Sequence, residues 1–346
     1  PEVHADHRVT FRFRAPHARD VSVAVEGANP LPMVEAQGIW SVTTPALDPD
    51  LYGYSFVMDG SLAIDPSNPL LKPNLLTTQS VVHVGGPASL PWETTDVPHG
   101  VLHHHFYSSA VVGDQRDLYV YTPPGYEKEP RNAFPVLYLL HGFSDDASAW
   151  VVVGRANVII DNLVAQKKVK PMIVVMPLGY GAPEILAGGF SGFGKDRALL
   201  RRNLDKFGES LFAEVLPLVE STYRVETGRE ARAIAGLSMG GSQSLVAGLN
   251  HLDEFAWIGA FSAGGLSDDF DTEFPRLDGN ANSRMRLLWI ACGVSDPLID
   301  VNRGLRTWLQ SKAIRHTGVE TAGGHTWMVW RRNLAAFTGL LFGISP

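Results

Sequence analysis

The first ninety residues alternate apolar and polar side chains in short runs. The pattern is clear at residues 9–14, 21–25 and 52–57. A period of two places alternate side chains on opposite faces of a strand, so each run predicts a strand with one buried face. Turn-forming pairs such as Asn29-Pro30 separate the runs. Short strands with regular turns predict a small antiparallel β-sandwich.

A stretch rich in glycine and proline ends this pattern. Residues 85–87 read Gly-Gly-Pro, and Pro91 and Pro98 follow. Such clusters are typical of connecting segments. We therefore predict an N-terminal module over residues 1–90 and a linker over residues 91–100.

Residues 101–346 combine solid apolar runs with helical spacing. Residues 136–140 and 172–176 are almost entirely apolar, as expected of parallel strands buried on both faces. Strand–helix alternation of this kind predicts an α/β domain with a mostly parallel sheet flanked by helices. The other predicted strands are 116–122, 231–235, 256–261, 287–292 and 314–320, and helical spacing runs over 157–169 and 204–219, with a kink at Pro217.

Composition narrows the protein class. The chain has 346 residues, of which 45% are apolar and 19% charged, so most of it can bury a core. A net charge of −7 argues against a nucleic-acid binder, and no apolar run has the length of a membrane span. The single cysteine, Cys292, excludes an intrachain disulfide and is expected to be an inert buried thiol. The chain begins at Pro1, and both a removed signal peptide and a fragment remain open.

The sharpest local signal is a GxSxG motif formed by Gly236, Ser238 and Gly240. It directly follows a predicted strand and opens a helix, which is the context of a nucleophile elbow. The serine oxygen must project above the sheet from a strained turn, and small neighbours are needed because backbone crowds that turn. The bare pattern is weak in a chain with 34 glycines, but its position between strand and helix favours Ser238 as a nucleophile.

The acid partner is expected beyond a late strand. Asp296 lies in the loop after residues 287–292 and is the preferred residue. Asp268 and Asp269 follow the preceding strand, and Asp300 is expected to cap the next helix.

The base must be a histidine that follows the acid in the chain. His325 comes after two glycines at the end of the last predicted strand, whereas His316 lies within that strand and is expected to be structural. His325 would take the proton of Ser238, and Asp296 would orient the imidazole.

An oxyanion hole needs two backbone N–H groups. One belongs to the residue after the nucleophile, Met239, and the other is expected from Phe143, in the loop that follows residues 136–140. His141 precedes the serine in chain order, and we expect it to hold this loop.

With these residues in place, the chain resembles the bacterial feruloyl esterases of the esterase D-like group, carbohydrate esterase family 1. The resemblance spans nearly all of residues 101–346, and it implies an α/β-hydrolase fold with the triad Ser238, Asp296 and His325. The stretches that carry it are residues 119–126, 139–142, Asp145 and Asp146 with Trp150, 236–241, and 324–327 with Trp330.

Residues 52–60 and 65–69 resemble immunoglobulin-like E-set modules classed with carbohydrate-binding family 48. Aromatic side chains that stack on sugar rings would make such a module a carbohydrate binder. The alternation indicates that several of its aromatic residues belong to the core instead, and both interpretations stay open. The residues concerned are Trp40, Tyr52, Tyr54 and Phe56.

A glycine-rich, aromatic stretch at residues 177–194 follows a strand end, where α/β sheets bind ligands. We predict an active-site loop; the alternative is a surface loop whose aromatic residues pack into the core. The candidate substrate-binding residues are Trp150, Tyr180, Phe190, Phe193 and Trp327.

No metal site or cofactor is predicted. Of His103, His104 and His105, only the first and last share a strand face, and no carboxylate cluster completes a site. Asp145 and Asp146 are more typical of a helix cap than of a cation site.

The residues and the resemblance together predict a serine carboxylic-ester hydrolase, a feruloyl esterase that releases hydroxycinnamate from plant xylan through an acyl-enzyme. The expected partner is an acylated plant polysaccharide or oligosaccharide, with no nucleic acid and no membrane, and the expected location is secreted or periplasmic. Alternatives within the chemistry are an acetylxylan esterase, an enterochelin-type siderophore esterase and an acyl transferase. An alternative of another class is a carbohydrate-binding protein with an inert hydrolase domain.

Overall fold

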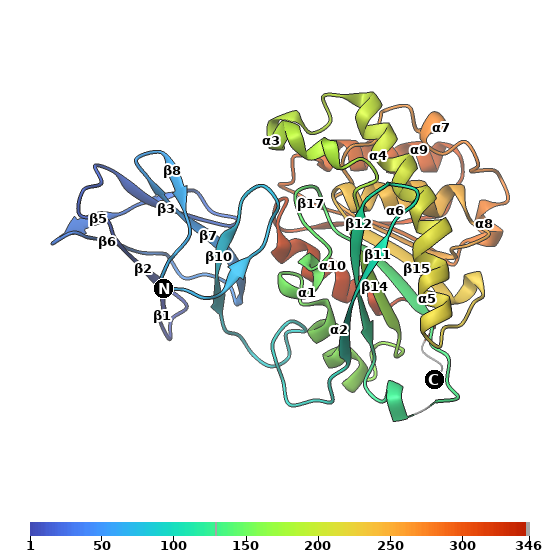
Figure 1. Cartoon of the computed structure of the whole chain (residues 1–346), viewed down its shortest axis with the longest axis horizontal. Coiled ribbons are helices and arrows are strands. Elements are labelled where there is room, and N and C mark those ends of the chain that lie inside the picture. The colour runs from blue at the N-terminus through green and yellow to red at the C-terminus, as the bar shows by residue number, and fades with distance from the viewer. Residues whose placement is uncertain (129, 344–346) are drawn as a thin grey trace. The chain divides into compact units, whose positions relative to one another are not determined.

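A computed structural model describes residues 1–128 and 130–343 of the chain. The chain divides into two compact units, Pro1–Thr94 and Thr95–Pro346 (Figure 1). The division falls inside the stretch 91–100 in which a linker is expected.

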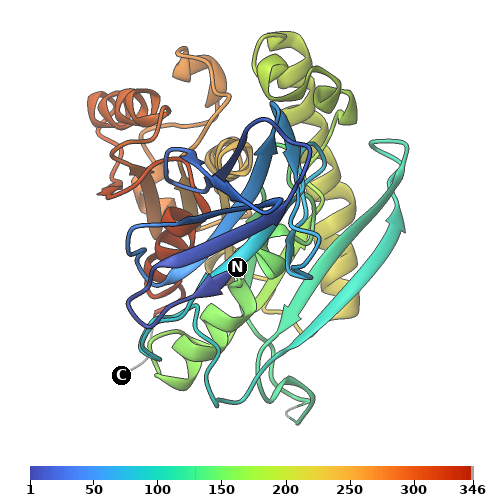
Figure 2. The same ribbon diagram turned by 90° about the vertical axis from the view of Figure 1, so that its left-hand side faces the viewer.

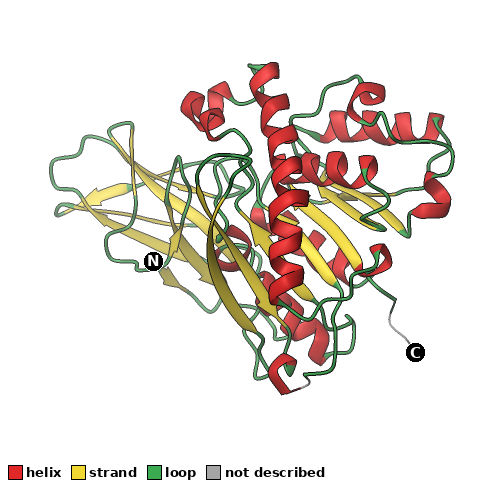
Figure 3. Cartoon of the chain, turned by 45° about the vertical axis from the view of Figure 1, so that its right-hand side comes forward, coloured by secondary structure: helices red, strands yellow, loops and turns green. Residues whose placement is uncertain are grey.

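The N-terminal unit consists of two antiparallel sheets joined by turns (Figure 3). The first sheet has the order β1 (Glu2–Val3), β2 (Val9–Arg14), β6 (Ile39–Thr43) and β5 (Val34–Ala36). The second has the order β4 (Leu31–Pro32), β3 (Val21–Val25), β7 (Asp50–Met58), β10 (Gln79–Val84) and β9 (Leu71–Lys72), with β8 (Ser61–Ala63) paired to β7.

The inner faces of these two sheets meet through aromatic rings. Phe11 of β2 lies 4.7 Å from Tyr54 and 6.5 Å from Phe56 of β7, measured between ring centroids. All three side chains are fully buried. Alternate positions of both strands therefore share one core, and the predicted β-sandwich is confirmed.

The second unit is built on an eight-stranded sheet with parallel strands at its centre. Its order is β11 (Val101–Ser108), β12 (Gln115–Thr122), β14 (Ile173–Pro177), β13 (Val136–Leu140), β15 (Arg232–Leu237), β16 (Trp257–Phe261), β17 (Leu287–Gly293) and β18 (Thr317–Thr321). β11 and β12 form an antiparallel hairpin at one edge (Figure 2), and the strands from β14 to β18 run parallel. The predicted α/β-hydrolase architecture is confirmed, although the last strand begins at Thr317 rather than at residue 314.

Helices cover both faces of this sheet (Figure 3). Two successive residues of β16 contact helices on opposite faces of the sheet. A methyl group at Gly248 of α6 (Met239–Asn250) would lie 2.7 Å from the Ile258 side chain, and one at Gly259 would lie 2.8 Å from Phe337 of α10 (Trp327–Thr338). One face carries α1 (Ala149–Val152), α2 (Ala156–Ala165) and α10 (Trp327–Thr338), and the other carries α4 (Arg197–Ser210), α5 (Leu216–Thr222), α6 (Met239–Asn250) and α9 (Ile299–Ser311). Shorter helices are η1 (Tyr126–Lys128), η2 (Pro183–Gly188), α3 (Gly189–Gly192), η4 (Arg229–Ala231), α7 (Phe270–Glu273) and α8 (Ala281–Arg284).

The long helix with the expected kink is interrupted in a defined way. A π-helical turn, η3 (Leu211–Val215), separates α4 from α5, and the N–H of Leu216 donates to the carbonyl of Leu211. Pro217 lies in the first turn of α5, where its missing N–H is tolerated. The irregular turn in the helix therefore precedes the proline.

Across the described ranges, none of the helices has the length and apolar composition that crossing a membrane requires.

Candidate active site

The turn between β15 and α6 holds Ser238 in a strained conformation. Its φ of 51° and ψ of −118° lie in a region that residues with a Cβ seldom adopt. Such strain costs about 1–3 kcal/mol and persists only where the surroundings enforce it. Here the Ser238 N–H donates to the Phe261 carbonyl at 2.8 Å, and its carbonyl accepts from the Gly264 N–H at 3.1 Å. The strand-to-helix turn therefore has the backbone geometry that we predicted for a nucleophile elbow.

The glycines of the motif are required by close backbone approach. A methyl group at Gly236 would lie 2.5 Å from the Gly240 backbone, and one at Gly240 would lie 2.6 Å from the Leu140 carbonyl oxygen. No side chain fits at such distances, so α6 can start directly above the sheet only with glycine at both positions.

Relief of this strain is measurable. We expect the free energy of unfolding of Ser238→Gly to be about 1 kcal/mol higher than that of Ser238→Ala, because glycine adopts positive φ without a steric penalty. Chemical denaturation of both variants measures the difference. A lower value for the glycine variant would contradict the strained-turn interpretation.

Three side chains at the carboxyl edge of the sheet form a hydrogen-bonded series. His325 Nε2 lies 3.1 Å from Ser238 Oγ, and His325 Nδ1 lies 2.9 Å from Asp296 Oδ2. Because an ionised carboxylate only accepts, Nδ1–H donates to Asp296, and Nε2 of the neutral ring is left to accept from the serine hydroxyl. Asp296 follows β17, and His325 lies between β18 and α10. The structure thus brings together the three residues predicted as a triad.

The electrostatics keep Asp296 ionised. Its side chain has no exposed surface, and burial alone raises the pKa of this carboxyl. Hydrogen bonds from the His325 ring and the Leu298 N–H, together with the charge of His325, more than offset that effect and lower the pKa of Asp296 below its usual value. The carboxylate is therefore present as an anion across the neutral pH range.

Neighbouring residues that no motif indicated surround Asp296 and His325. The Trp330 ring stands edge-on to His325, with centroids 4.8 Å apart, and its indole N–H donates to Ser262 Oγ at 3.2 Å. The Ser262 hydroxyl is also a hydrogen-bond partner of Asp296. Buried Asn302 donates to the carbonyls of Ala263 and Leu298. The only sequence signal for Ser262 is its place after β16, the strand beside the nucleophile strand.

The loop after β13 lies beside Ser238. A methyl group at Gly142 would lie 3.3 Å from Ser238 Cβ. Buried His141 holds this loop: its Nδ1–H donates to the Gly142 carbonyl, and its Nε2 accepts from the Gly179 N–H, both at 2.8 Å. Burial lowers the pKa of His141 to about 4, so its ring is neutral. This geometry agrees with the structural role predicted for His141.

The two predicted oxyanion donors flank Ser238. Met239 is the first residue of α6, where backbone N–H groups point outward without partners inside the helix. Phe143 follows Gly142 in the adjacent loop. An oxyanion formed at Ser238 would therefore lie between a helix N-terminus and this loop.

The competing acids and base lie elsewhere. Asp268 and Asp269 are exposed, and Asp269 accepts from the Thr272 N–H at the start of α7. Asp300 has a side chain that is 93% exposed and lies within the first turn of α9 rather than capping it, which corrects the prediction of a cap. His316 precedes β18, at the strand end opposite to His325.

The predicted substrate-binding residues divide into two groups. Trp150, Tyr180 and Trp327 are at most 1% exposed, so their assignment to the pocket wall was wrong. Trp150 donates to the Leu140 carbonyl, Tyr180 donates to the Asp145 carbonyl, and the two indoles contact each other edge-on. All three therefore belong to the buried core.

Phe190 and Phe193 are the accessible members of that set. Phe190 is 61% exposed, and the Phe193 ring lies 4.4 Å from that of Phe143, measured between centroids. Phe143 also contacts Phe190, at 5.9 Å. A cluster of three phenylalanines therefore adjoins the loop beside Ser238, and we name Phe143, Phe190 and Phe193 the phenylalanine cluster.

The weaker sequence features have ordinary structural roles. His104 stacks on Tyr119 with ring centroids 4.1 Å apart, and burial raises the pKa of the Cys292 thiol to about 12. Asp146 accepts from the Ser148 N–H just before α1. Within residues 1–128 and 130–343, no three His, Cys, Asp or Glu side chains are grouped as metal ligands.

The aromatic residues considered for sugar stacking in the N-terminal unit are all at most 9% exposed: Trp40, Tyr52, Tyr54 and Phe56.

Comparison with known proteins agrees with this geometry. Over 351 aligned residues covering 99% of the chain, it is 27% identical to an endo-1,4-beta-xylanase/feruloyl esterase of Xylanibacter ruminicola. The chain spans 46% of the length of that relative.

Two solved structures share the fold. A ferulic acid esterase of Anaeromyces mucronatus in complex with ferulic acid matches with a TM-score of 0.64 and 24% identity, over 75% of this chain and 97% of that one. The enterobactin esterase of Shigella flexneri matches with a TM-score of 0.70 and 18% identity, over 96% of this chain and 92% of that one.

The comparison with family models covers most of the second unit. Residues 109–341, about two thirds of the chain, match the family described as "Putative esterase". The chain therefore belongs to this esterase family.

Proposed function

We propose that the chain is a feruloyl esterase in which Ser238 is the nucleophile, His325 the general base and Asp296 the residue that orients it. The observation that carries the proposal is the series of two hydrogen bonds, 2.9 Å and 3.1 Å long, that joins Asp296 through His325 to Ser238. The spacing is within the reach that proton transfer requires.

The chemistry follows from these positions. Ser238 Oγ attacks the ester carbonyl as its proton passes to His325 Nε2, and the carbonyl oxygen becomes an oxyanion facing the N–H groups of Met239 and Phe143. The ester C–O bond then breaks, and His325 gives the proton to the departing alcohol oxygen. Water attacks the acyl-enzyme with His325 again as base, and the acid is released as Ser238 regains its proton.

The acyl class is inferred from the phenylalanine cluster and from the relative. Rings at 4.4 Å and 5.9 Å around Phe143 offer an apolar wall to a planar aromatic acyl group. The xylanase/feruloyl esterase aligns over nearly the whole chain. We infer a hydroxycinnamate ester of a plant polysaccharide or oligosaccharide as substrate. Since such a polymer lies outside the cell, the proposal includes a secreted or periplasmic location.

Phe193→Ala tests this wall. We expect kcat/KM for methyl ferulate to fall about tenfold, which corresponds to the loss of one aromatic contact, while the value for 4-nitrophenyl acetate stays within threefold. Steady-state kinetics of the variant measure both. Phe106→Ala, at a 75% exposed position of β11, is the control and should change neither value. An equal loss for both esters would refute an acyl-binding role for Phe193.

A second function is favoured by one observation. The enterobactin esterase fold matches 96% of the chain, including the N-terminal unit, whereas the ferulic acid esterase fold matches 75%. Comparison of kcat/KM for methyl ferulate, acetylated xylan and enterobactin separates the feruloyl, acetylxylan and siderophore esterases. We expect methyl ferulate to be preferred; preference for either of the others would replace the proposed substrate.

The remaining alternatives give different products. An acyl transferase would place the acyl group on an added alcohol, whereas a hydrolase releases the free acid. A carbohydrate-binding protein with an inert hydrolase domain would release neither. The hydrogen-bonded series at Ser238 argues against inertness, and the buried aromatic residues of the N-terminal unit offer no stacking surface.

A further inference from the structure

The loop after β16, residues 262–269, forms a wall between the nucleophile and the phenylalanine cluster. A methyl group at Gly264 would lie 3.7 Å from Ser238 Oγ, and one at Gly265 would lie 3.5 Å from Phe193 Cζ. Gly265 has a φ of 98°, which a side chain would strain. We name residues 264–266 the acyl wall.

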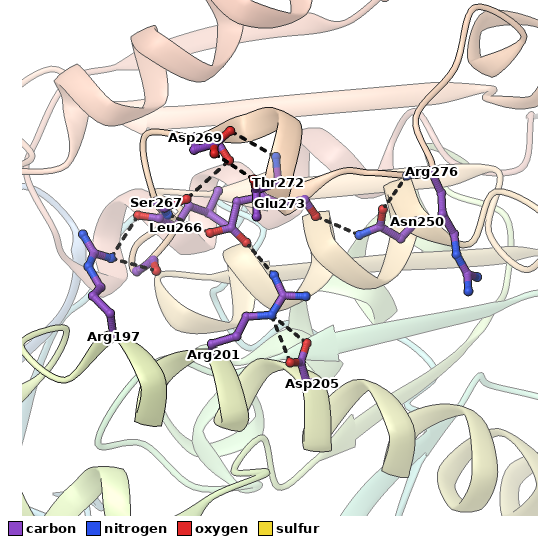
Figure 4. A network of polar contacts seen from close by, with 11 residues as sticks. Arg197, Arg201, Asp205, Asn250, Leu266, Ser267, Asp269, Thr272, Glu273 and Arg276 are labelled. Carbon is purple, nitrogen blue, oxygen red and sulfur yellow. Dashed lines mark hydrogen bonds and ion pairs between the residues drawn. The ribbon is translucent and has the colours of Figure 1, made fainter.

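Asn302 and Ser242 donate to the Ala263 and Gly264 carbonyls at the start of this loop. Its next three residues are held by side chains of α4 and α7 (Figure 4). Arg197 of α4 donates to the carbonyls of Gly265 and Leu266, at 3.4 Å and 3.3 Å. Glu273 of α7 accepts from the Ser267 N–H at 2.9 Å through Oε1. Because the loop has no strand or helix of its own between β16 and α7, these bonds limit its movement.

The Glu273 carboxylate links the loop to α4. Its side chain is 8% exposed, and its second oxygen, Oε2, accepts from Arg201 Nη1 at 3.2 Å. Burying a carboxylate is costly unless both oxygens are satisfied, and here each oxygen has a donor. Arg201 lies one helical turn after Arg197, so both contacts tie the same helix to the same loop (Figure 4).

Glu273 is itself anchored at a second point. The Asn250 side chain, at the end of α6, donates to the Glu273 backbone carbonyl at 2.9 Å and accepts from the Arg276 N–H (Figure 4). Glu273 therefore contacts α4 through its carboxylate and the end of α6 through its backbone carbonyl. The Gly264 end of the acyl wall is bonded to Ser238 and Ser242, so loss of the Glu273 charge would loosen only the other end, next to Ser267, without touching the triad.

We propose that Glu273, held by Arg201, is a positioning residue that fixes the end of the acyl wall beside Phe193 and so determines the preference for aromatic over short acyl groups. This inference rests on the proposed role of Ser238. An acetyl group ends near Ser238 Oγ, whereas a hydroxycinnamoyl group extends along the wall to Phe193. Displacement of the wall should therefore affect only the longer acyl group.

The test compares Glu273→Gln with Asp205→Asn. Asp205 is the other acidic partner of Arg201, one turn along α4 and exposed, and it does not reach the loop. With 4-nitrophenyl acetate, butyrate and ferulate the leaving group is constant. We expect Glu273→Gln to lower kcat/KM for the ferulate about tenfold, mainly through KM, and to leave the acetate within twofold. Asp205→Asn should leave all three within twofold.

Loss of activity in equal proportion for all three esters, or no change in any, would overturn the proposal. If Glu273→Gln does not fold, Arg201→Lys serves in its place, because it keeps the charge but not the geometry of two contacts; the same selective loss is expected, at a smaller size. A wild type that hydrolyses the acetate but not the ferulate would refute the feruloyl function, and the positioning role is then read from the butyrate-to-acetate ratio.

Discussion

Replacing Ser238 with alanine is expected to lower kcat for 4-nitrophenyl acetate by about 10⁵- to 10⁶-fold. In the proposed mechanism the hydroxyl forms the covalent bond, and the donors proposed at Met239 and Phe143 can assist only a slow attack by water once it is gone. The Ser238 backbone bonds to Phe261 and Gly264 do not involve the hydroxyl, so the variant should fold as the wild type does.

Initial rates and thermal unfolding of the purified variant measure both statements. Ser221→Ala is a suitable control, because Ser221 is exposed on α5 and its hydroxyl donates to the Leu218 carbonyl. The control should keep its rate within twofold. A Ser238→Ala enzyme that retains more than about one hundredth of the wild-type rate, a far smaller loss than a triad nucleophile should show, would assign the nucleophile elsewhere.

Replacing Asp296 with asparagine is expected to lower kcat by about 10⁴-fold without changing the volume at the site. An amide in this place can donate to Nδ1, which would leave the proton on Nε2, where it cannot accept from Ser238. The carboxylate is buried and bonded at 2.9 Å to His325, so no water replaces its role. Asp300→Asn, at an exposed position of α9, is the matched control.

Asp296→Asn should also change how the free energy of unfolding depends on pH. The pKa of Asp296 is lowered in the folded protein, so its contribution to the free energy of unfolding is complete above its unfolded pKa of about 3.9 and is lost as the pH falls through the folded value. We expect the difference in unfolding free energy between wild type and Asp296→Asn to shrink as the pH falls below about pH 4. Denaturation at several pH values measures it; a difference that grows further below about pH 4 would contradict the lowered pKa.

The meeting of Ser238, Asp296 and His325 could be predicted because it depends on local patterns and chain order. The strand before Ser238, the glycines at 236 and 240, and the strand ends before Asp296 and His325 are all readable along the chain. Parallel strands bring their carboxyl ends to one edge, so residues placed at those ends meet.

The pocket wall could not be predicted in the same way. Trp150, Tyr180 and Trp327 have the composition of a binding site, but each is covered by segments distant in sequence, as the contact between Trp150 and Trp327 shows. Whether an aromatic residue lies at the surface or below it depends on such long-range packing.

The supporting residues were missed for a related reason. Ser262, Asn302 and Glu273 belong to no motif, and each acts through a backbone group or side chain of another element. Serine, asparagine and glutamate are common at the surface, so their types carry no signal until the fold buries them.

Detection of the acyl-enzyme tests the proposed mechanism and substrate together. With excess 4-nitrophenyl ferulate, the activated leaving group should make acylation faster than deacylation, so that the intermediate accumulates before an acid quench. Proteolysis and mass spectrometry should then find one feruloyl group on the peptide that contains Ser238, and none in Ser238→Ala. Release of ferulate with no label at Ser238, a label on another residue, or no turnover of the ferulate ester would contradict a feruloyl esterase that acts through Ser238.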